Sequence, residues 1–349
     1  MRSAIPHGSW WHLPTGPTNT ICDIAGVRVG HADVRGPGLC TGVTAVLPHE
    51  GDLFREPVAA AVSVLNGFGK SAGLMQLAEL GEIETPILFT NTFGVAACTT
   101  ALIRRAIARN PAIGRRIGTV NALVLECNDG TVNDIQALAV TGDHADAAIE
   151  AASTGFAQGT VGAGSGMKTF GYAGGIGSAS RQVVLQGGSR YQLGALVLSN
   201  FGQASDLRVF GQMLPPDGAP PDTAEADKGS VIMLLATDAP LDSRQLGRVA
   251  RRGGAALGRL GSHMGHQSGD IAIAFSTANR ITRPGGDTHP VTRVCESRMD
   301  RFFAAAVEAT EEAILNAMWH ATPRPGYDGR RLPGFRDAFD RFRAQGSPA

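Results

Sequence analysis

The sequence predicts an α/β domain in which buried sheets are covered by helices. Short, unbroken apolar runs, such as residues 58–65 and 231–236, are typical of strands that are buried on both faces. Residues 298–321 instead carry apolar side chains at helical spacing. At 349 residues the chain is long enough to bury a large core. Because strands and helices do not alternate regularly, we do not expect a doubly wound dinucleotide fold.

Apolar runs, caps and breakers predict the individual elements in chain order. Strands are expected at residues 22–29, 42–47, 58–65, 86–90, 120–125, 193–198, 231–236 and 270–275. Helices are expected at residues 71–81, 92–110, 146–154, 243–261 and 298–321. Residues 1–20 and the tail from Pro323 onward are interrupted by proline and glycine, so we expect both to be irregular.

The overall composition excludes some classes of function. Lysine plus arginine equals aspartate plus glutamate at 31 each, which gives no electrostatic footprint for nucleic acid or an anionic membrane. The five cysteines lack CxxC spacing, so we expect buried thiols and neither a disulfide framework nor a zinc site. The first residues contain no apolar signal-peptide core, and no later run is long enough to span a membrane. We therefore expect a cytoplasmic protein.

Three other motifs have ordinary structural explanations. Residues 159–177 contain eight glycines, but they match no P-loop and no dinucleotide fingerprint, so we interpret them as close-packed turns outside regular elements. His263 and His266 lack a third metal ligand and are interpreted as a loop pair. The arginines of residues 244–259 are interpreted as the solvated face of a helix.

The boundary between residues 215–229 and residues 230–237 is the most informative part of the chain. Residues 215–229 are crowded with Pro, Asp, Ala and Gly, and we expect a mobile, exposed loop there. Ser230 follows directly and begins an apolar strand. Ser230 is either a serine that merely begins a strand or a nucleophile that cuts the chain between Gly229 and Ser230.

The second interpretation has a definite chemical basis. A serine hydroxyl needs an adjacent base to act as a nucleophile. After a cut, the new α-amine of Ser230 would supply that base, because α-amines have a reference pKa of about 7.7 to 8.0. Gly229 suits such a cut, since without a β-carbon its carbonyl is accessible and it tolerates strained torsions.

Polar residues at other strand ends complete a candidate catalytic site. Ser268 and Asp270 stand at the beginning of a second apolar run and could orient the new amine and relay a proton. Asn200 follows the strand of residues 193–198 and could donate an N–H to an oxyanion. Glu126 is a candidate for binding the ammonium group of the substrate, although it could equally be a surface or turn-capping glutamate.

At this point the chain resembles the self-processing aminopeptidases that include the L-aminopeptidase D-esterase/amidase and the β-aminopeptidases. The resemblance runs from about Asn19 to about Gly329. It is carried by the segments Ile24-Ala-Gly-Val-Arg-Val-Gly-His31, Asn66-Gly-Phe-Gly-Lys-Ser-Ala-Gly73, Asn128-Asp-Gly130 with Asn133-Asp134, Gly174-Gly-Ile-Gly-Ser178, Ser199-Asn-Phe-Gly202 and Ala236-Thr-Asp-Ala-Pro240.

Membership implies an αββα sandwich like that of the amino-terminal nucleophile hydrolases, but with different connectivity. It implies a precursor cut into an α chain, 1–229, and a β chain, 230–349, assembled as a homotetramer of such pairs, with no metal or organic cofactor. The nucleophile falls on Ser230, the second serine on Ser268, the acidic residue on Asp270 and the oxyanion asparagine on Asn200. The family often has glutamate where Asp270 stands. An aromatic residue that helps to hold the oxyanion falls on Thr131, a shorter side chain that could alter substrate preference.

We therefore predict a serine aminopeptidase or amidase that removes the amino-terminal residue of small peptides, amides or esters through an acyl-Ser230 intermediate. Two alternatives remain at this stage. One is a self-cleaving hydrolase of a non-peptide amide, such as a pantetheine-like compound. The other is a non-catalytic small-molecule binding protein of the same fold.

Overall fold

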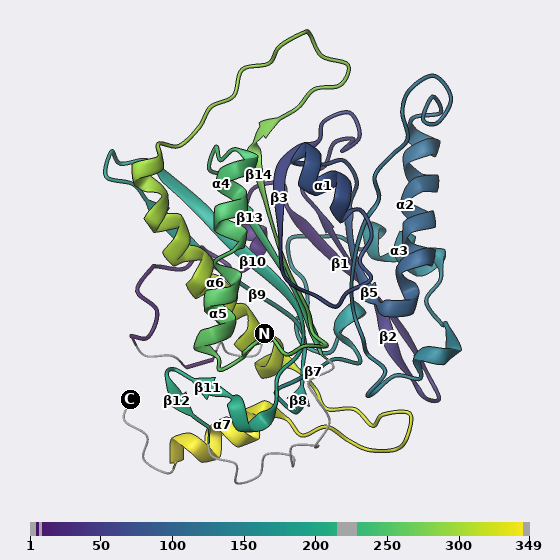
Figure 1. Cartoon of the computed structure of the whole chain (residues 1–349). Coiled ribbons are helices and arrows are strands. Elements are labelled where there is room, and N and C mark those ends of the chain that lie inside the picture. The colour runs from purple at the N-terminus through teal and green to yellow at the C-terminus, as the bar shows by residue number, and fades with distance from the viewer. Residues whose placement is uncertain (1–4, 7–8, 215–228, 345–349) are drawn as a thin grey trace.

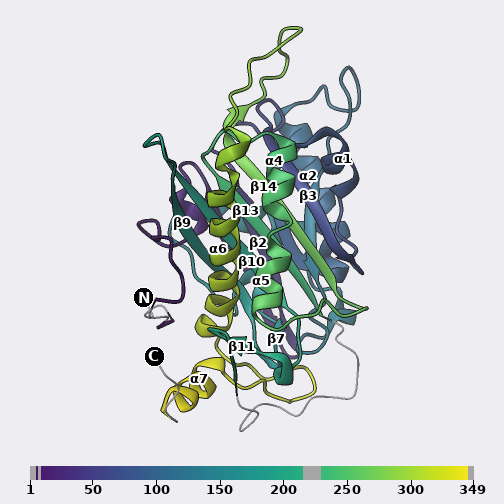
Figure 2. The same cartoon turned by 60° about the vertical axis from the view of Figure 1, so that its left-hand side comes forward.

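The computed structural model describes residues 5–6, 9–214 and 229–344, and within them the chain forms four layers. Helices α2 (Val95–Arg109) and α3 (Gly142–Glu150) form one outer layer. Helices α4 (Ser243–Ala250), α5 (Gly253–Arg259) and α6 (Met299–His320) form the other. Two sheets lie between these layers (Figures 1 and 2). The predicted αββα arrangement is confirmed.

The sheet next to α2 and α3 has four strands in the order β1-β2-β5-β6. Their bounds are Arg28–Gly36, Leu39–Leu47, Ile87–Asn91 and Leu123–Cys127. β1 and β2 form an antiparallel hairpin, β2 pairs antiparallel with β5, and β5 pairs parallel with β6. All residues of β5 and β6 are buried, which agrees with their almost unbroken apolar sequence.

The second sheet has six strands in the order β4-β3-β14-β13-β10-β9. Their bounds, in that order, are Glu82–Ile83, Val58–Gly67, Gly269–Arg280, Ser230–Thr237, Arg190–Asn200 and Gly175–Val184. Only β13 and β14 are parallel neighbours in this sheet. Two small ribbons stand apart, formed by β7 (Lys168–Thr169) with β8 (Tyr172–Ala173) and by β11 (Arg208–Val209) with β12 (Gln212–Met213).

Each boundary between layers is an apolar core. The two sheets bury residues such as Phe89, Leu198 and Ile232 between them. α2 and α3 cover the four-stranded sheet through a smaller cluster. α4, α5 and α6 cover the six-stranded sheet through the largest cluster. Gly177 of β9 allows α6 to approach, because a Cβ there would lie 1.9 Å from the carbonyl oxygen of Ala313.

Several predicted elements differ from the structure. The tail is not wholly irregular, because α7 (Phe335–Ala344) packs Phe335, Ala338 and Phe339 against the core at helical spacing. The strand predicted at 22–29 begins only at Arg28, and residues 21–23 form a 3-10 helix before it. The helix predicted at 146–154 begins earlier, at Gly142, after the cap Thr141.

Two more predictions are wrong in detail. The helix expected at 243–261 is divided into α4 and α5 just before Gly253 and Gly254, where glycine lowers helix propensity. The glycine-rich stretch contains β7 and β8 and contributes three residues to β9, where Gly177 leaves room for α6. Helix α1 (Leu74–Leu80) ends at Gly81 in the left-handed conformation, as expected.

The arginines of α4 and α5 are not simply a solvated face. Arg252 stacks on the ring of Phe303 with 3.7 Å between its guanidinium carbon and the ring centroid. Arg259 pairs with the buried Glu311 at 3.0 Å. These cations therefore join the helices of the outer layer, which the sequence pattern alone does not reveal.

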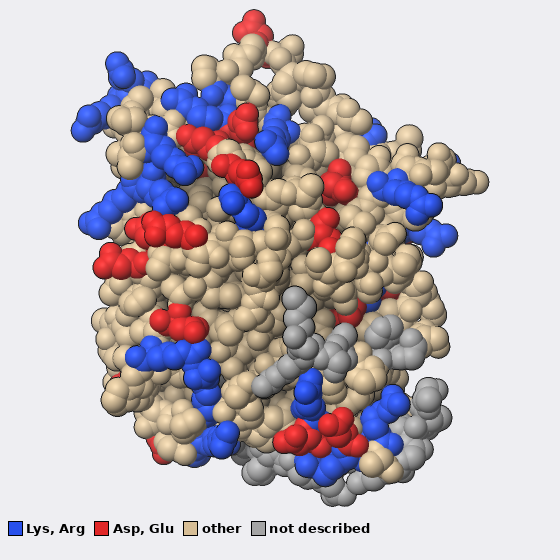
Figure 3. Space-filling model, turned by 180° about the vertical axis from the view of Figure 1, so that it is seen from behind, with Lys and Arg blue, Asp and Glu red and all other residues tan. Residues whose placement is uncertain are grey.

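Acidic and basic side chains are interspersed on the face shown in Figure 3, in agreement with the balanced composition. The loop is predicted at residues 215–229, of which residues 215–228 lie outside the described part of the chain. Among the helices that the structure describes, none has the length and apolar character needed to cross a membrane.

Candidate active site

The candidate residues meet because of the register of three adjacent strands. Asn200, the last residue of β10, pairs with Ser230, the first residue of β13. Ser230 in turn lies opposite Gly269, the first residue of the parallel strand β14. Strand order and register thus bring Asn200, Ser230 and the Ser268-Gly269-Asp270 segment to one end of the six-stranded sheet.

The hydroxyl of Ser230 lies beside the peptide bond that precedes it. It donates a hydrogen bond to the carbonyl oxygen of Gly229 at 2.7 Å, and it accepts one from the backbone N–H of Gly269 at 3.2 Å. Ser230 is 4 % exposed. A buried hydroxyl held next to a carbonyl has the position that a nucleophile for that peptide bond would need.

The four-stranded sheet contacts the backbone of Ser230 through Cys127. This last residue of β6 is fully buried, and its thiol lies 3.3 Å from the carbonyl oxygen of Ser230 and 3.6 Å from that of Leu198. Burial, followed by the nearby carboxylates of Glu126 and Asp270, raises the pKa of this thiol well above its usual value. Cys127 therefore stays protonated and is a donor that joins the two sheets, a role that its sequence position did not indicate.

Asn200 is oriented by two backbone groups. Its Oδ1 accepts a hydrogen bond from the N–H of Lys168 at 2.8 Å, and its Nδ2 donates to the carbonyl oxygen of Asn128 at 2.8 Å. These contacts distinguish the amide oxygen from the nitrogen. Because Nδ2 carries two hydrogens, one remains for an oxyanion. The glycine-rich stretch thus serves the site through the backbone of Lys168.

Ser268 and Asp270 form a buried pair at the beginning of β14. The Ser268 hydroxyl donates to Oδ1 of Asp270 at 2.6 Å, and both residues are 1 % exposed. In the described part of the chain Ser268 makes no hydrogen bond to Ser230. The two residues flank Gly269 in the chain, and the N–H of Gly269 donates to the Ser230 hydroxyl.

Glu126 is a buried carboxylate on β6, next to Cys127. Its Oε1 accepts from the backbone N–H of Lys70 at 2.7 Å, and its Oε2 accepts from the hydroxyl of Thr92. It is 3 % exposed, and no side-chain nitrogen of a Lys, Arg or His among the described residues lies within 4.0 Å of its carboxylate. A buried carboxylate usually has a cationic partner, so Glu126 is suited to receive a cation from outside the chain.

Thr131 lies on an exposed turn after Asn128. Its neighbour Asp129 is fully buried, and burial raises the pKa of Asp129 to about 6, although hydrogen bonds from Thr41 and Asn133 oppose this shift. This segment also supplies the carbonyl of Asn128 that holds Asn200.

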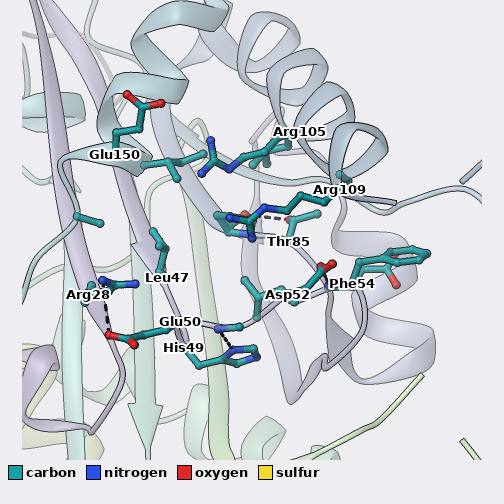
Figure 4. Close-up of a pocket in the computed structure, with 18 residues that line it drawn as sticks. Arg28, Leu47, His49, Glu50, Asp52, Phe54, Thr85, Arg105, Arg109 and Glu150 are labelled. Atoms are coloured by element: carbon teal, nitrogen blue, oxygen red, sulfur yellow. Dashed lines mark hydrogen bonds and ion pairs between the residues drawn. The ribbon is translucent and has the colours of Figure 1, made fainter. Parts of the chain in front are cut away.

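A separate hollow of about 220 Å³ opens at the opposite end of the four-stranded sheet (Figure 4). It is lined by Leu47 at the end of β2, by Pro86 before β5 and by Arg105 and Arg109 of α2. Burial lowers the pKa of His49, which also lines it, and this imidazole accepts from the N–H of Gly51. None of the predicted catalytic residues lines this hollow.

Within the described residues no cluster of three or more His, Cys, Asp or Glu side chains could hold a metal ion. His263 lies in a loop and is 3.8 Å from the carboxylate of Asp206. All five cysteines are free, and Cys295 is exposed although the sequence predicts buried thiols.

The αββα arrangement of the layers is that of the amino-terminal nucleophile hydrolases. The chain belongs to peptidase family S58, whose pattern matches residues 19–332. It is 38 % identical to the beta-peptidyl aminopeptidase BapA of Sphingosinicella microcystinivorans over 348 residues, covering 91 % of this chain and 86 % of the relative.

Two solved structures are similar along almost the whole chain. The PH0078 protein of Pyrococcus horikoshii OT3 has a TM-score of 0.91 and 42 % identity, covering 96 % of this chain and 97 % of that one. The L-aminopeptidase D-Ala-esterase/amidase of Ochrobactrum anthropi has a TM-score of 0.87 and 33 % identity, covering 95 % and 96 %. It is described as a prototype serine aminopeptidase and a variant of the Ntn hydrolase fold.

These relationships decide between the functional classes that the sequence left open. The chain is a serine-type aminopeptidase or amidase, as predicted, and neither a binding protein without activity nor a hydrolase of pantetheine-like compounds is supported.

Proposed function

We propose that this enzyme cuts its own chain between Gly229 and Ser230 and then uses Ser230 as an amino-terminal nucleophile. The products would be an α chain, 1–229, and a β chain, 230–349. The main support is the Ser230 hydroxyl, buried and hydrogen-bonded to the carbonyl oxygen of Gly229. The oxygen of Ser230 attacks the Gly229 carbonyl carbon, the C–N bond breaks as the nitrogen takes the proton, and water hydrolyses the resulting ester.

Turnover then follows the same chemistry on a substrate. The free α-amine of Ser230 takes the hydroxyl proton as the oxygen attacks the substrate carbonyl, and Asn200 donates its remaining N–H to the oxyanion. The leaving amine takes the proton, and water hydrolyses the acyl ester. We assign Ser268 and Asp270 the role of orienting the α-amine and relaying its proton, on the strength of their buried pairing beside Gly269.

Glu126 binds the ammonium group of the substrate in this proposal. Three observations support that role. The carboxylate is buried, it is oriented by hydrogen bonds that the N–H of Lys70 and the hydroxyl of Thr92 donate to it, and no cationic side-chain nitrogen of the described residues lies within 4.0 Å. We propose small peptides, amides or esters with a free amino group as substrates, including β-aminoacyl compounds, since the relatives are named for β-peptides. Thr131 would border the substrate and leave more space than an aromatic side chain.

We also propose a cytoplasmic homotetramer of α/β pairs, by analogy with the family. The oligomer can be tested by light scattering of the purified protein, where a mass near four chains is expected. A monomeric mass under assay conditions contradicts this part of the proposal.

A denaturing gel tests the central step. Purified protein should give two bands of about two-thirds and one-third of the 36.2 kDa chain, with Ser at the amino terminus of the smaller one. Ser230→Ala should remain uncut and inactive, whereas Ser165→Ala, which removes a buried serine on another loop, should be cut normally. Full activity in an uncut enzyme, or in Ser230→Ala, would rule out the proposal. Activity should also fall below about pH 7 as the α-amine becomes protonated.

A further inference from the structure

An exposed lysine lies beside the proposed ammonium site. The backbone N–H of Lys70 donates to Oε1 of Glu126 at 2.7 Å, so this residue contacts the carboxylate directly. Its ammonium group lies 4.0 Å from the ring centroid of Phe68, which is 49 % exposed. No acidic side chain of the described residues lies within 4.0 Å of the Lys70 ammonium. Among the described residues, the contact of this ammonium group is therefore with the aromatic face of Phe68.

The segment that carries Lys70 follows β3, whose last residue, Gly67, pairs with Gly269 at the beginning of β14. A methyl group placed on Gly69 would lie 3.6 Å from Glu126 Oε1 and 3.9 Å from the Cα of Gly269. Gly269 in turn donates its N–H to the hydroxyl of Ser230. Gly69 therefore lies close to both Glu126 and Gly269, and Lys70 follows it directly in the chain.

We propose that Lys70 binds a carboxylate of the substrate, and that the preferred substrates begin with an acidic β-aminoacyl residue such as β-aspartyl. This inference rests on the proposed function, in which Glu126 binds the substrate ammonium and Ser230 attacks the carbonyl. It adds the chemical class of the residue that is released.

The reason for choosing β-aspartyl is that the backbone of Lys70 contacts the carboxylate of Glu126 directly. In a β-aspartyl residue the ammonium and the carboxylate share one carbon atom, and the scissile carbonyl is two bonds further along. Lys70 begins at the atom that contacts Glu126, and an extended lysine side chain spans roughly 6 Å from Cα to Nζ. It can therefore fold back onto a carboxylate beside the Glu126-bound ammonium, where burial by substrate strengthens the pair.

The test compares two nitroanilides that differ in one group. β-Aspartyl p-nitroanilide carries a carboxylate where 3-aminobutanoyl p-nitroanilide carries a methyl group. We expect wild-type kcat/KM to favour the β-aspartyl compound by roughly tenfold or more, the effect typical of one charge-assisted hydrogen bond. Lys70→Met keeps the backbone N–H and should reduce this ratio at least about tenfold, while Lys70→Arg should restore much of it.

Control variants and further outcomes make the test decisive. Arg115→Met removes a cation from an exposed turn after α2 and should leave the ratio unchanged. Equal losses on both compounds in Lys70→Met, or a wild-type preference for 3-aminobutanoyl or α-aspartyl anilide, overturn the inference. Failure of the proposed function is recognised separately, because Ser230→Ala would then still hydrolyse these compounds.

Discussion

Asn200 offers the most direct test of how the strand ends produce catalysis. In the structure its Oδ1 is occupied by Lys168 and one Nδ2 hydrogen by Asn128, so a single N–H is available for the oxyanion. Loss of one such donor typically lowers kcat by about 10² to 10³, which corresponds to about 2.7–4 kcal/mol. We expect losses of this size in both Asn200→Ala and Asn200→Asp, since Asp can accept from Lys168 but cannot donate.

Stability has to be separated from catalysis in this experiment. Removing the Asn200 side chain leaves buried backbone partners unsatisfied, at a cost of about 1–3 kcal/mol. Asn316→Ala is a matched control, because Asn316 is similarly buried and donates to the carbonyl of Ser178 at 3.0 Å, away from the site. It should lower the denaturation midpoint but not kcat.

The assay measures kcat with an aminoacyl nitroanilide and divides it by the fraction of cut chain seen on a denaturing gel. This correction is needed because the same oxyanion hole would slow the cut. A folded, fully cut Asn200→Ala enzyme with kcat within about threefold of wild type would refute the assigned role.

Three further changes test the fold around the site. Burial raises the pKa of Asp129 from 3.8 to about 6, so this group makes the fold progressively less stable as pH rises from 3.8 to about 6. Asp129→Asn should therefore raise the urea midpoint more at pH 8 than at pH 4.5, and equal effects at both values contradict this explanation. Arg181→Met leaves the carboxylates of Glu308 and Glu312 buried without their cation. Urea titrations should show that it lowers the free energy of unfolding by about 3–5 kcal/mol, and a change under about 1 kcal/mol would contradict this expectation. Gly177→Val should prevent α6 from packing on β9, because even the Cβ of the new side chain would meet the carbonyl oxygen of Ala313. We expect little soluble protein, and a normal yield with an unchanged thermal midpoint would contradict this expectation.

Arg181 also illustrates how the chain stays together if it is cut. It is fully buried on β9, in the proposed α chain, and pairs with Glu308 at 3.0 Å and Glu312 at 2.6 Å on α6, in the proposed β chain. The indole N–H groups of Trp10 and Trp11 likewise donate to Glu311 of α6. These contacts join segments on the two sides of the proposed cut through side chains, so they do not depend on the Gly229–Ser230 bond.

The sequence by itself determined the class of fold and the boundary that matters most. Unbroken apolar runs predicted the central strands, and the change in composition before Ser230 identified the position where β13 begins. Those signals are local, since they depend on neighbours in the chain. The helix α7 was missed because prolines and glycines before it obscured a short amphipathic pattern.

Only the tertiary structure decided which groups surround Ser230. The pairing of Asn200 with Ser230, the thiol of Cys127 under its carbonyl and the backbone N–H of Lys168 on Asn200 depend on strand order and register. The sequence leaves these open because residues from distant segments meet only when two sheets pack face to face. The same packing leaves Glu126 buried without a described cation, and this observation underlies both the proposed substrate and the role of Lys70.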